Sequence, residues 1–176
     1  SVGDYSNVTI DGQTATQVGT TSRGAMGGSC AIITAWRAPG TAGTTINVVA
    51  TVVAPSVVFQ SGYCALWSLN DADTVLATTN AAVNDPALNT NTVTDGVAVA
   101  ALLGYSGASP ETAWTGLTEV FDSVNVFGDD LFSGASANIS SGSTPLTVSA
   151  DITPNLASSI ASICVSFNPD ALVATL

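Results

Sequence analysis

Apolar and polar residues alternate over short stretches of this chain, and turn-forming residues separate the stretches. Alternation with a period of two is typical of β-strands, because successive side chains of a strand point to opposite faces of its sheet. Asp11-Gly12 and Asp95-Gly96 are favourable turn sequences between such runs. We predict strands over these β-prone runs: Val8–Ile10, Ala15–Val18, Cys30–Trp36, Thr45–Val53, Val57–Phe59, Gly62–Leu69, Val97–Tyr105, Ala135–Ile139, Leu146–Ala150 and Ile160–Phe167.

Three of these runs indicate how their faces are covered. Val97–Leu103 is almost continuously apolar, which predicts a central strand, although a short helix fits the same run. Leu66 lies opposite the other apolar residues of Gly62–Leu69, so this strand is expected to be covered on both faces. The last run predicts one buried face, since its apolar and small polar residues alternate: Ala161, Ile163, Val165 and Phe167 against Ser162, Cys164 and Ser166.

The composition favours the same fold class. Thr, Ser, Val, Ala and Gly dominate, while the helix-favouring residues Glu, Lys and Arg are nearly missing. We therefore predict an all-β protein, an antiparallel β-sandwich of jelly-roll type, with residues 1–176 forming one domain. No run approaches the roughly 20 apolar residues that span a bilayer, and no signal peptide is visible.

The missing residue types exclude several kinds of chemistry. Without His there is no Ser–His–Asp or Cys–His relay, and without Lys there is no P-loop lysine, Schiff base or Ser–Lys pair. The formal net charge of −11 repels phosphate, so we expect no nucleic-acid partner and no membrane partner. Cys30, Cys64 and Cys164 are too few for an all-thiolate zinc site. We interpret them as free thiols on strands, with a Cys30–Cys64 disulfide as the alternative.

Acidic residues offer the first candidate site. Calcium binds six to eight oxygens from loop carboxylates and carbonyls, so either acidic cluster could hold it, but neither has EF-hand spacing. The preferred interpretation is solvated loop tips, and no metal or other cofactor is predicted. Glu111 and Glu119 are a candidate glycosidase pair, but nothing else indicates a catalytic cleft. The two clusters are Asp71 with Asp73, and Asp122 with Asn125, Asp129 and Asp130.

Aromatic residues offer the second candidate site. A sugar-stacking platform could be built from Trp36, Trp67, Trp114, Tyr63 and Tyr105, of which Trp36, Trp67 and Tyr63 are the candidate ligand-binding residues. Core or half-buried strand positions are the preferred interpretation of these rings. The glycine-rich loop 24–28 lacks a following Lys, so phosphate binding there is not expected.

Two stretches carry a resemblance to a known family. The first is Val8–Val18, a hairpin of the form I-x-G-x-x-A-T-x-V, which leads through a glycine-rich loop to Ala31–Arg37. The second is Ala113-Trp-Thr-Gly-Leu-Thr-Glu-Val-Phe-Asp122, followed by Ser133–Ala137 and a closing hairpin rich in Ser and Thr. Together they resemble an all-β domain of virion proteins of tailed bacteriophages, over about residues 8–168.

The resemblance implies a non-enzymatic structural protein on the virion surface, of the capsid-decoration, spike or fibre type. Such proteins assemble as homo-oligomers, most often trimers, and contact other virion proteins such as the major capsid protein. Trp114, Glu119 and Asp122 lie on the shared motif, where we expect a structural corner and no catalytic residue. Relatives have opening strands before the first hairpin, where this chain has seven residues. Those strands are either absent or replaced by a partner chain.

Two further functions are alternatives. One is a glycan- or receptor-binding module of a tail fibre, which would use loop aromatics and a calcium ion. The other is an extracellular filament subunit joined by donated strands, which the missing opening strands would suit. Enzymatic activity ranks last.

Overall fold

The structure is a computed structural model in which the described residues form strands and no helix. It describes residues 5–24, 30–39, 46–52, 64–67, 69, 72–81, 86–105, 111–124, 130–140, 145–153 and 160–169. Every strand pair among them is antiparallel. The predicted all-β class and antiparallel sheet packing are therefore confirmed.

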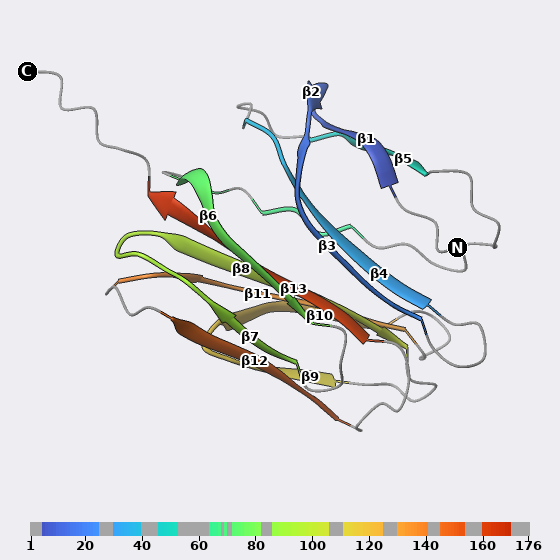
Figure 1. The fold of residues 1–176 in the computed structure, drawn as a ribbon. Helices are drawn as coiled ribbons and strands as arrows, with labels where there is room; N and C mark the ends of the chain where they lie inside the picture. The colour runs from blue at the N-terminus through green and yellow to red at the C-terminus, as the bar shows by residue number, and fades with distance from the viewer. Residues whose placement is uncertain are drawn as a thin grey trace, which may run out of the picture.

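A five-stranded sheet lies at the centre of the molecule (Figure 1). Its strand order is β10-β11-β8-β13-β6, so β8 is the middle strand. The strands are β6 (Ala72–Ala81), β8 (Val97–Tyr105), β10 (Thr118–Val124), β11 (Asp130–Asn138) and β13 (Ile160–Pro169). The central position and the bounds predicted for Val97–Tyr105 are confirmed.

Two smaller sheets cover the two faces of this central sheet. One face packs against the three-stranded sheet β7-β12-β9, formed by β7 (Ala87–Thr90), β9 (Glu111–Thr115) and β12 (Leu146–Thr153). The other face packs against the pair β3 (Thr16–Gly24) and β4 (Cys30–Arg37). The molecule is therefore three layers thick where β3 and β4 lie over β13 (Figure 1).

A third small sheet extends beyond these layers. It has the order β2-β1-β5 and is formed by β1 (Tyr5–Ile10), β2 (Gln13–Thr14) and β5 (Val48–Val52). The predicted Asp11-Gly12 turn joins β1 to β2, and both residues have positive φ, 50° and 77°. This is the type I′ geometry that suits a two-residue hairpin.

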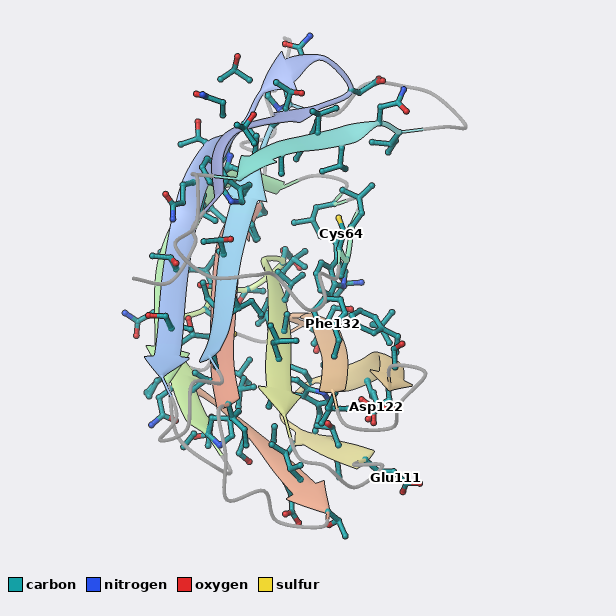
Figure 2. The ribbon with its side chains drawn as sticks, turned by 90° about the vertical axis from the view of Figure 1, so that its right-hand side faces the viewer. Cys64, Glu111, Asp122 and Phe132 are labelled. Carbon is teal, nitrogen blue, oxygen red and sulfur yellow. The ribbon has the colours of Figure 1, made fainter. Side chains whose placement is uncertain are left out.

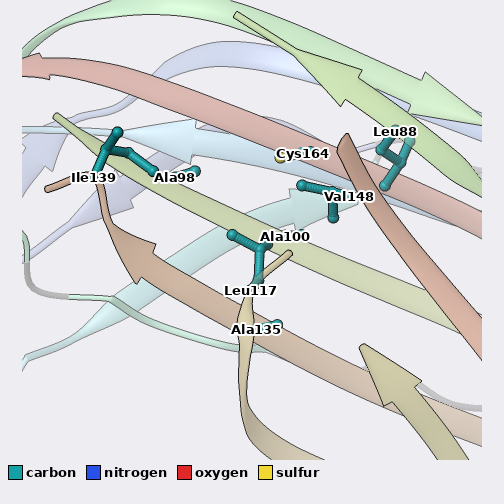
Figure 3. Packing of buried hydrophobic residues seen from close by; sticks show 8 residues of the cluster. All are labelled: Leu88, Ala98, Ala100, Leu117, Ala135, Ile139, Val148 and Cys164. Carbon is teal, nitrogen blue, oxygen red and sulfur yellow. The ribbon is translucent and has the colours of Figure 1, made fainter. Parts of the chain in front are cut away.

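The core has a separate cluster on each side of the central sheet. Ile163, Val165 and Phe167 of β13 pack toward β3 and β4. The opposite side packs toward β7-β12-β9 through mostly small or branched side chains, shown in Figure 3: Leu88, Ala98, Ala100, Leu117, Ala135, Ile139, Val148 and Cys164. Small residues on β8 and β11 allow the two sheets to approach closely.

The prediction of a single buried face for the last strand is wrong, because both faces of β13 are buried. Ser162, Cys164 and Ser166 face the layer formed by β7, β9 and β12 instead of solvent. The Ser166 hydroxyl donates a hydrogen bond to the Asn91 carbonyl oxygen at 2.6 Å, which satisfies it away from water. Small hydroxyl-bearing residues can therefore line a buried sheet face as well as an exposed one.

The prediction of a strand over Gly62–Leu69 is also wrong for the described part of that segment. Cys64–Trp67 forms no strand; Ala65 and Trp67 pack onto the core, and Leu66 is 47% exposed instead of covered. The apolar alternation arises because every second side chain, at Ala65, Trp67 and Leu69, packs against the core. The predicted run Val57–Phe59 lies outside the described residues.

Five of the described strands were not predicted: β2, β6, β7, β9 and β10. In β6 the reason is visible in two threonines. Thr78 donates a hydrogen bond to the Val18 carbonyl oxygen in β3, and Thr79 donates one to the Asn89 carbonyl oxygen in β7, both at 2.9 Å. Polar side chains thus connect β6 to both covering layers. The sequence of β6 therefore lacks the alternation of apolar and polar residues that would have predicted a strand.

The order of strands is compatible with the predicted jelly-roll type but does not confirm it. From β6 onward the chain passes between the two packed sheets, and β6-β13-β8-β11 lies opposite β7-β12-β9. Two such interleaved sheets are typical of a jelly roll. In a regular jelly roll β10 would pair beside β9, whereas here it pairs with β11 at the edge of the central sheet.

Candidate functional site

The corner between β9 and β10 carries the most distinctive sequence run of the chain. The chain leaves the three-stranded sheet after Thr115 and enters the central sheet at Thr118. Gly116 turns the chain with a φ of 86°, a left-handed conformation that favours glycine. Leu117 is buried between the two sheets. The corner therefore fixes the place where the chain changes layers.

Two side chains of the predicted corner residues tie these layers together. The Trp114 Nε1–H on β9 donates a 2.8 Å hydrogen bond to the Ser133 hydroxyl on β11. The Thr112 backbone N–H on β9 donates a 2.8 Å hydrogen bond to Asp122 Oδ2 on β10. Trp114 and Asp122 thus connect β9 to two strands of the central sheet.

The third corner residue, Glu119, takes a different position. Its side chain is exposed. Partial desolvation raises its pKa above the ordinary value, and the negative charges of Asp122 and Glu111 raise it further. The structure therefore places the three carboxylates of this corner within electrostatic reach of one another, and Figure 2 shows Glu111 and Asp122 on the same side of the molecule.

The acidic corner is not arranged as a metal site in the described part of the chain. No group of three or more Asp, Glu or Cys side chains there could hold a metal ion. Of the candidate calcium ligands, Asp122 accepts the Thr112 hydrogen bond, Asn125 and Asp129 lie outside the described residues, and Asp130 begins β11. Asp71 also lies outside them, and Asp73 is in β6 instead of a loop tip.

We expect the Trp114–Ser133 hydrogen bond to stabilise the folded state measurably. Trp114→Phe removes the N–H donor, and should lower the free energy of unfolding by about 1–2 kcal/mol in urea titrations. Trp36→Phe is the matched control, because the buried Trp36 Nε1–H has no hydrogen-bond partner to lose. A double-mutant cycle with Ser133→Ala should give a coupling energy of about 1 kcal/mol, and additive effects would contradict the prediction.

An apolar groove lies beside the free edge of the central sheet. It has a volume of about 280 Å³, and Figure 2 shows two of its residues, Cys64 and Phe132, near each other. Val120 and Leu66 contribute exposed apolar side chains, 57% and 47% accessible. The full lining is Cys64, Ala65, Leu66, Trp67, Val120, Phe121, Ser123 and Phe132.

Three aromatic rings form the floor of this groove. The Phe121 centroid lies 6.0 Å from that of Trp67 and 5.1 Å from that of Phe132, in tilted arrangements that favour ring–ring attraction. Gly134 on β11 makes room for them, since a Cβ there would collide with the Phe121 ring and lie 2.9 Å from Trp67 Cζ2. The Trp67 Nε1–H is buried without a hydrogen-bond partner in the described structure.

The other aromatic candidates are not gathered at this groove. Trp36 lies on β4, half-buried, and pairs in the ladder with Gln17 of β3. Trp114 belongs to the β9–β10 corner. Tyr63 lies outside the described residues. A sugar platform built from all these rings is therefore absent from the described structure, and Trp67 is the predicted residue that lines a groove.

Val120, Phe121 and Phe132 line the groove but were not predicted as site residues. Val120 lies where the β10–β11 register shifts between Glu119 and Phe121, which allows both Val120 and Glu119 to be exposed. Such a bulge leaves no period-two signal. The available signal was the pair of phenylalanines in a chain with few aromatic residues.

The cysteines differ sharply in environment. Cys64 is exposed and Cys164 is buried, and both are free thiols, so the Cys30–Cys64 disulfide is excluded. Burial raises the pKa of the Cys164 thiol from 9.0 to about 12. The thiol of Cys164 therefore stays protonated and inert in the folded protein. The side chain of Cys30 is not among those described.

Cys164 is expected to make stability depend on alkaline pH. The unfolded thiol loses its proton near pH 9, whereas the folded thiol keeps it until about pH 12. The free energy of unfolding should therefore be unaffected by this group below pH 9 and fall by about 1.4 kcal/mol per pH unit above it. Thermal unfolding of the protein and of Cys164→Ala across this range measures the difference. Parallel pH curves for the two proteins would contradict the prediction.

The β2-β1-β5 sheet presents a second apolar surface. Every residue from Ile46 to Thr51 is exposed, and Val49 is 59% accessible. Strand β5 pairs with β1 on one side, and no other strand among the described residues pairs with it. It carries no charged residue. Among the described residues this is the longest run of exposed β-strand side chains.

Comparison with known proteins gives no relative. No protein-family model matches the chain, and no curated protein or solved structure matches it significantly. In the described part of the chain, no helix has the length and apolarity to span a membrane.

Proposed function

We propose that this chain is a non-enzymatic structural protein displayed on the virion surface, as a capsid-decoration, spike or fibre component, and that it assembles as a homo-oligomer, by resemblance a trimer. Its partners would be copies of itself and other virion proteins such as the major capsid protein. The resemblance of Val8–Val18 and Ala113–Asp122 to virion domains of tailed bacteriophages is the basis for the location.

The observation that carries the assembly proposal is the exposure of β5. A strand of β-branched residues with free faces is a surface that natural proteins cover with another chain or protect with charges. β5 carries no charge, and its side chains Val48 and Val49, with Ile46 just before the strand, are large, apolar and exposed. Burial against another subunit removes this surface from water without leaving unpaired ions.

The shared motif supports a structural role. Trp114 and Asp122 direct their polar groups at Ser133 and at the Thr112 backbone, so the distinctive residues hold two sheets together. In a decoration or fibre protein, a rigid β scaffold is the functional requirement.

Two measurements test the proposal together. Sedimentation of the purified chain at micromolar concentration should give a particle mass of at least twice the 17.5 kDa of one chain, and three times that mass for a trimer. Antibodies to the chain should label intact particles, and electron cryomicroscopy of those particles should place it on their outer surface. A stable monomer without affinity for capsids would overturn the proposal.

A second candidate function is glycan or receptor binding at the aromatic groove. The observation that favours it is the groove lined by the rings of Trp67, Phe121 and Phe132. Aromatic faces stack on sugar rings, and a groove lined by such rings is a suitable site for one. Glycan arrays should then show binding that Val120→Asp abolishes and Val49→Asp preserves, since both valines are similarly exposed. Addition of a chelator would show whether calcium takes part.

A further inference from the structure

Strand β10 carries two chemically different faces. Phe121 and Ser123 line the apolar groove on one face, and Val120 joins them at the bulge. Asp122 lies between Phe121 and Ser123 in the strand, points the opposite way and accepts the Thr112 hydrogen bond from β9. An apolar surface and an acidic surface therefore adjoin along one short strand.

Three exposed carboxylates form the acidic surface. Glu119 and Asp122 belong to β10, and Glu111 begins β9. Figure 2 shows Asp122 and Glu111 on the same side of the molecule as the groove residues Cys64 and Phe132. After partial desolvation, the negative charges of Asp122 and Glu111 raise the pKa of Glu119. A cation placed here would offset this repulsion.

The groove has room for one large side chain. Its volume of about 280 Å³ lies just below the range of about 300–1,000 Å³ that is usual for pockets enclosing small-molecule ligands. The rings of Trp67, Phe121 and Phe132 form its floor. In protein interfaces, most of the binding energy comes from a few anchoring side chains that fill such apolar pockets. The groove is therefore suited to an anchoring side chain of a protein partner.

The cation has to come from a different protein. The chain has 13 acidic residues and only two basic ones, Arg23 and Arg37, which lie on the paired strands β3 and β4. A second copy would bring a net charge of −11 toward the three carboxylates, and the two copies would repel one another there. A basic partner is attracted by the same charges.

We propose that the groove and the three carboxylates form a docking site for a basic segment of another protein, whose large apolar side chain enters the groove and whose neighbouring Lys or Arg residues pair with Glu119, Asp122 and Glu111. Asp122 can keep its hydrogen bond to Thr112 in such a complex, because a carboxylate accepts several hydrogen bonds. This inference rests on the proposed function for the identity of the partner, which would be another virion protein.

Selection from random peptides tests the chemistry of the partner. A library of short random peptides, selected by mRNA display on the immobilised full chain, should become enriched in sequences with Lys or Arg next to Phe, Leu or Trp. Binding of an enriched peptide, measured by fluorescence anisotropy, should weaken as salt is added, because ions screen the attraction between opposite charges. Absence of enrichment, or enrichment of neutral or acidic peptides, overturns the proposal.

One pair of variants tests the carboxylates. Glu119→Gln should raise the dissociation constant of the enriched peptide about two- to fivefold, as expected for the loss of one exposed ion pair. Asp95→Asn is the matched control and should leave it unchanged. It also removes one exposed carboxylate, but Asp95 lies before Val97, at the opposite end of β8 from the partner of Phe132. Equal effects of the two variants would show only a general attraction to an acidic chain and would overturn the site.

A second pair of variants tests the groove. Val120→Ser should raise the dissociation constant of the same peptide about fivefold or more, because it removes apolar contact with the anchoring side chain. Val49→Ser is the matched control, since it changes a valine of nearly equal exposure on β5 and should leave the peptide affinity unchanged. Circular dichroism verifies that all four variants are folded. An unchanged affinity in Val120→Ser overturns the proposal.

Other occupants of the groove give different results. A neutral glycan that binds the wild type but not Val120→Ser, or an oligomer that Val120→Ser dissociates, would assign the groove to that occupant and overturn the proposal. Labelling of intact particles tests the proposed function separately. Labelled particles without enrichment of basic peptides would overturn the docking site alone. Enriched peptides that lose affinity in both Glu119→Gln and Val120→Ser, without labelling of particles, would support the docking site and overturn the virion role alone.

Discussion

Replacing Gly116 with alanine is expected to lower the free energy of unfolding by about 4 kcal/mol. Two costs combine at this position. The φ of 86° strains any residue with a Cβ by about 1–2 kcal/mol. The added Cβ would also collide with the Thr147 backbone carbonyl oxygen of β12, which cannot move without distorting its pairing with β7.

Gly12→Ala is the matched control for this prediction. Gly12 has a similar φ of 77°, but a Cβ there meets nothing within 4 Å. Its replacement should cost only the backbone strain, about 1–2 kcal/mol. Urea denaturation followed by tryptophan fluorescence compares the two variants. Equal losses at the two glycines would show that the close approach to β12 does not restrict the corner.

Leu102→Ala is expected to lower the free energy of unfolding by about 2–5 kcal/mol. Leu102 is fully buried in the middle strand of the central sheet and packs with Leu131, Ala150, Ile152 and Ile160 between the two sheets. Removing its methyl groups leaves a cavity, because antiparallel pairing on both sides of β8 prevents the strands from closing in.

The control for Leu102 is the leucine in the groove. Leu66 is 47% exposed, so Leu66→Ala removes little buried area and should cost less than about 1 kcal/mol. Thermal unfolding of both variants provides the comparison. A loss at Leu66 as large as that at Leu102 would mean that the groove segment, and not β8, belongs to the main core.

Of the two candidate sites, the sequence pointed to residues of the β9–β10 corner but not to the apolar groove. Trp114 and Asp122 were singled out as corner residues from a sequence run, and the structure brings both to the β9–β10 corner with defined hydrogen bonds. The groove needed three segments that are distant in sequence. Trp67 comes from an irregular segment, Phe121 from β10 and Phe132 from β11, and only β-pairing places the two phenylalanines on adjacent strands.

Local pattern by itself determined the all-β class, the Asp11-Gly12 hairpin and the central strand Val97–Tyr105, because strand propensity, turn geometry and continuous hydrophobicity act over a few neighbouring residues. Only the tertiary structure decided which faces are buried. Ser166 looks the same in sequence whether it meets water or the Asn91 carbonyl, and the difference is made by a sheet whose residues lie far away along the chain. The same holds for β5, whose valines would suit a core strand but which no described part of this chain covers.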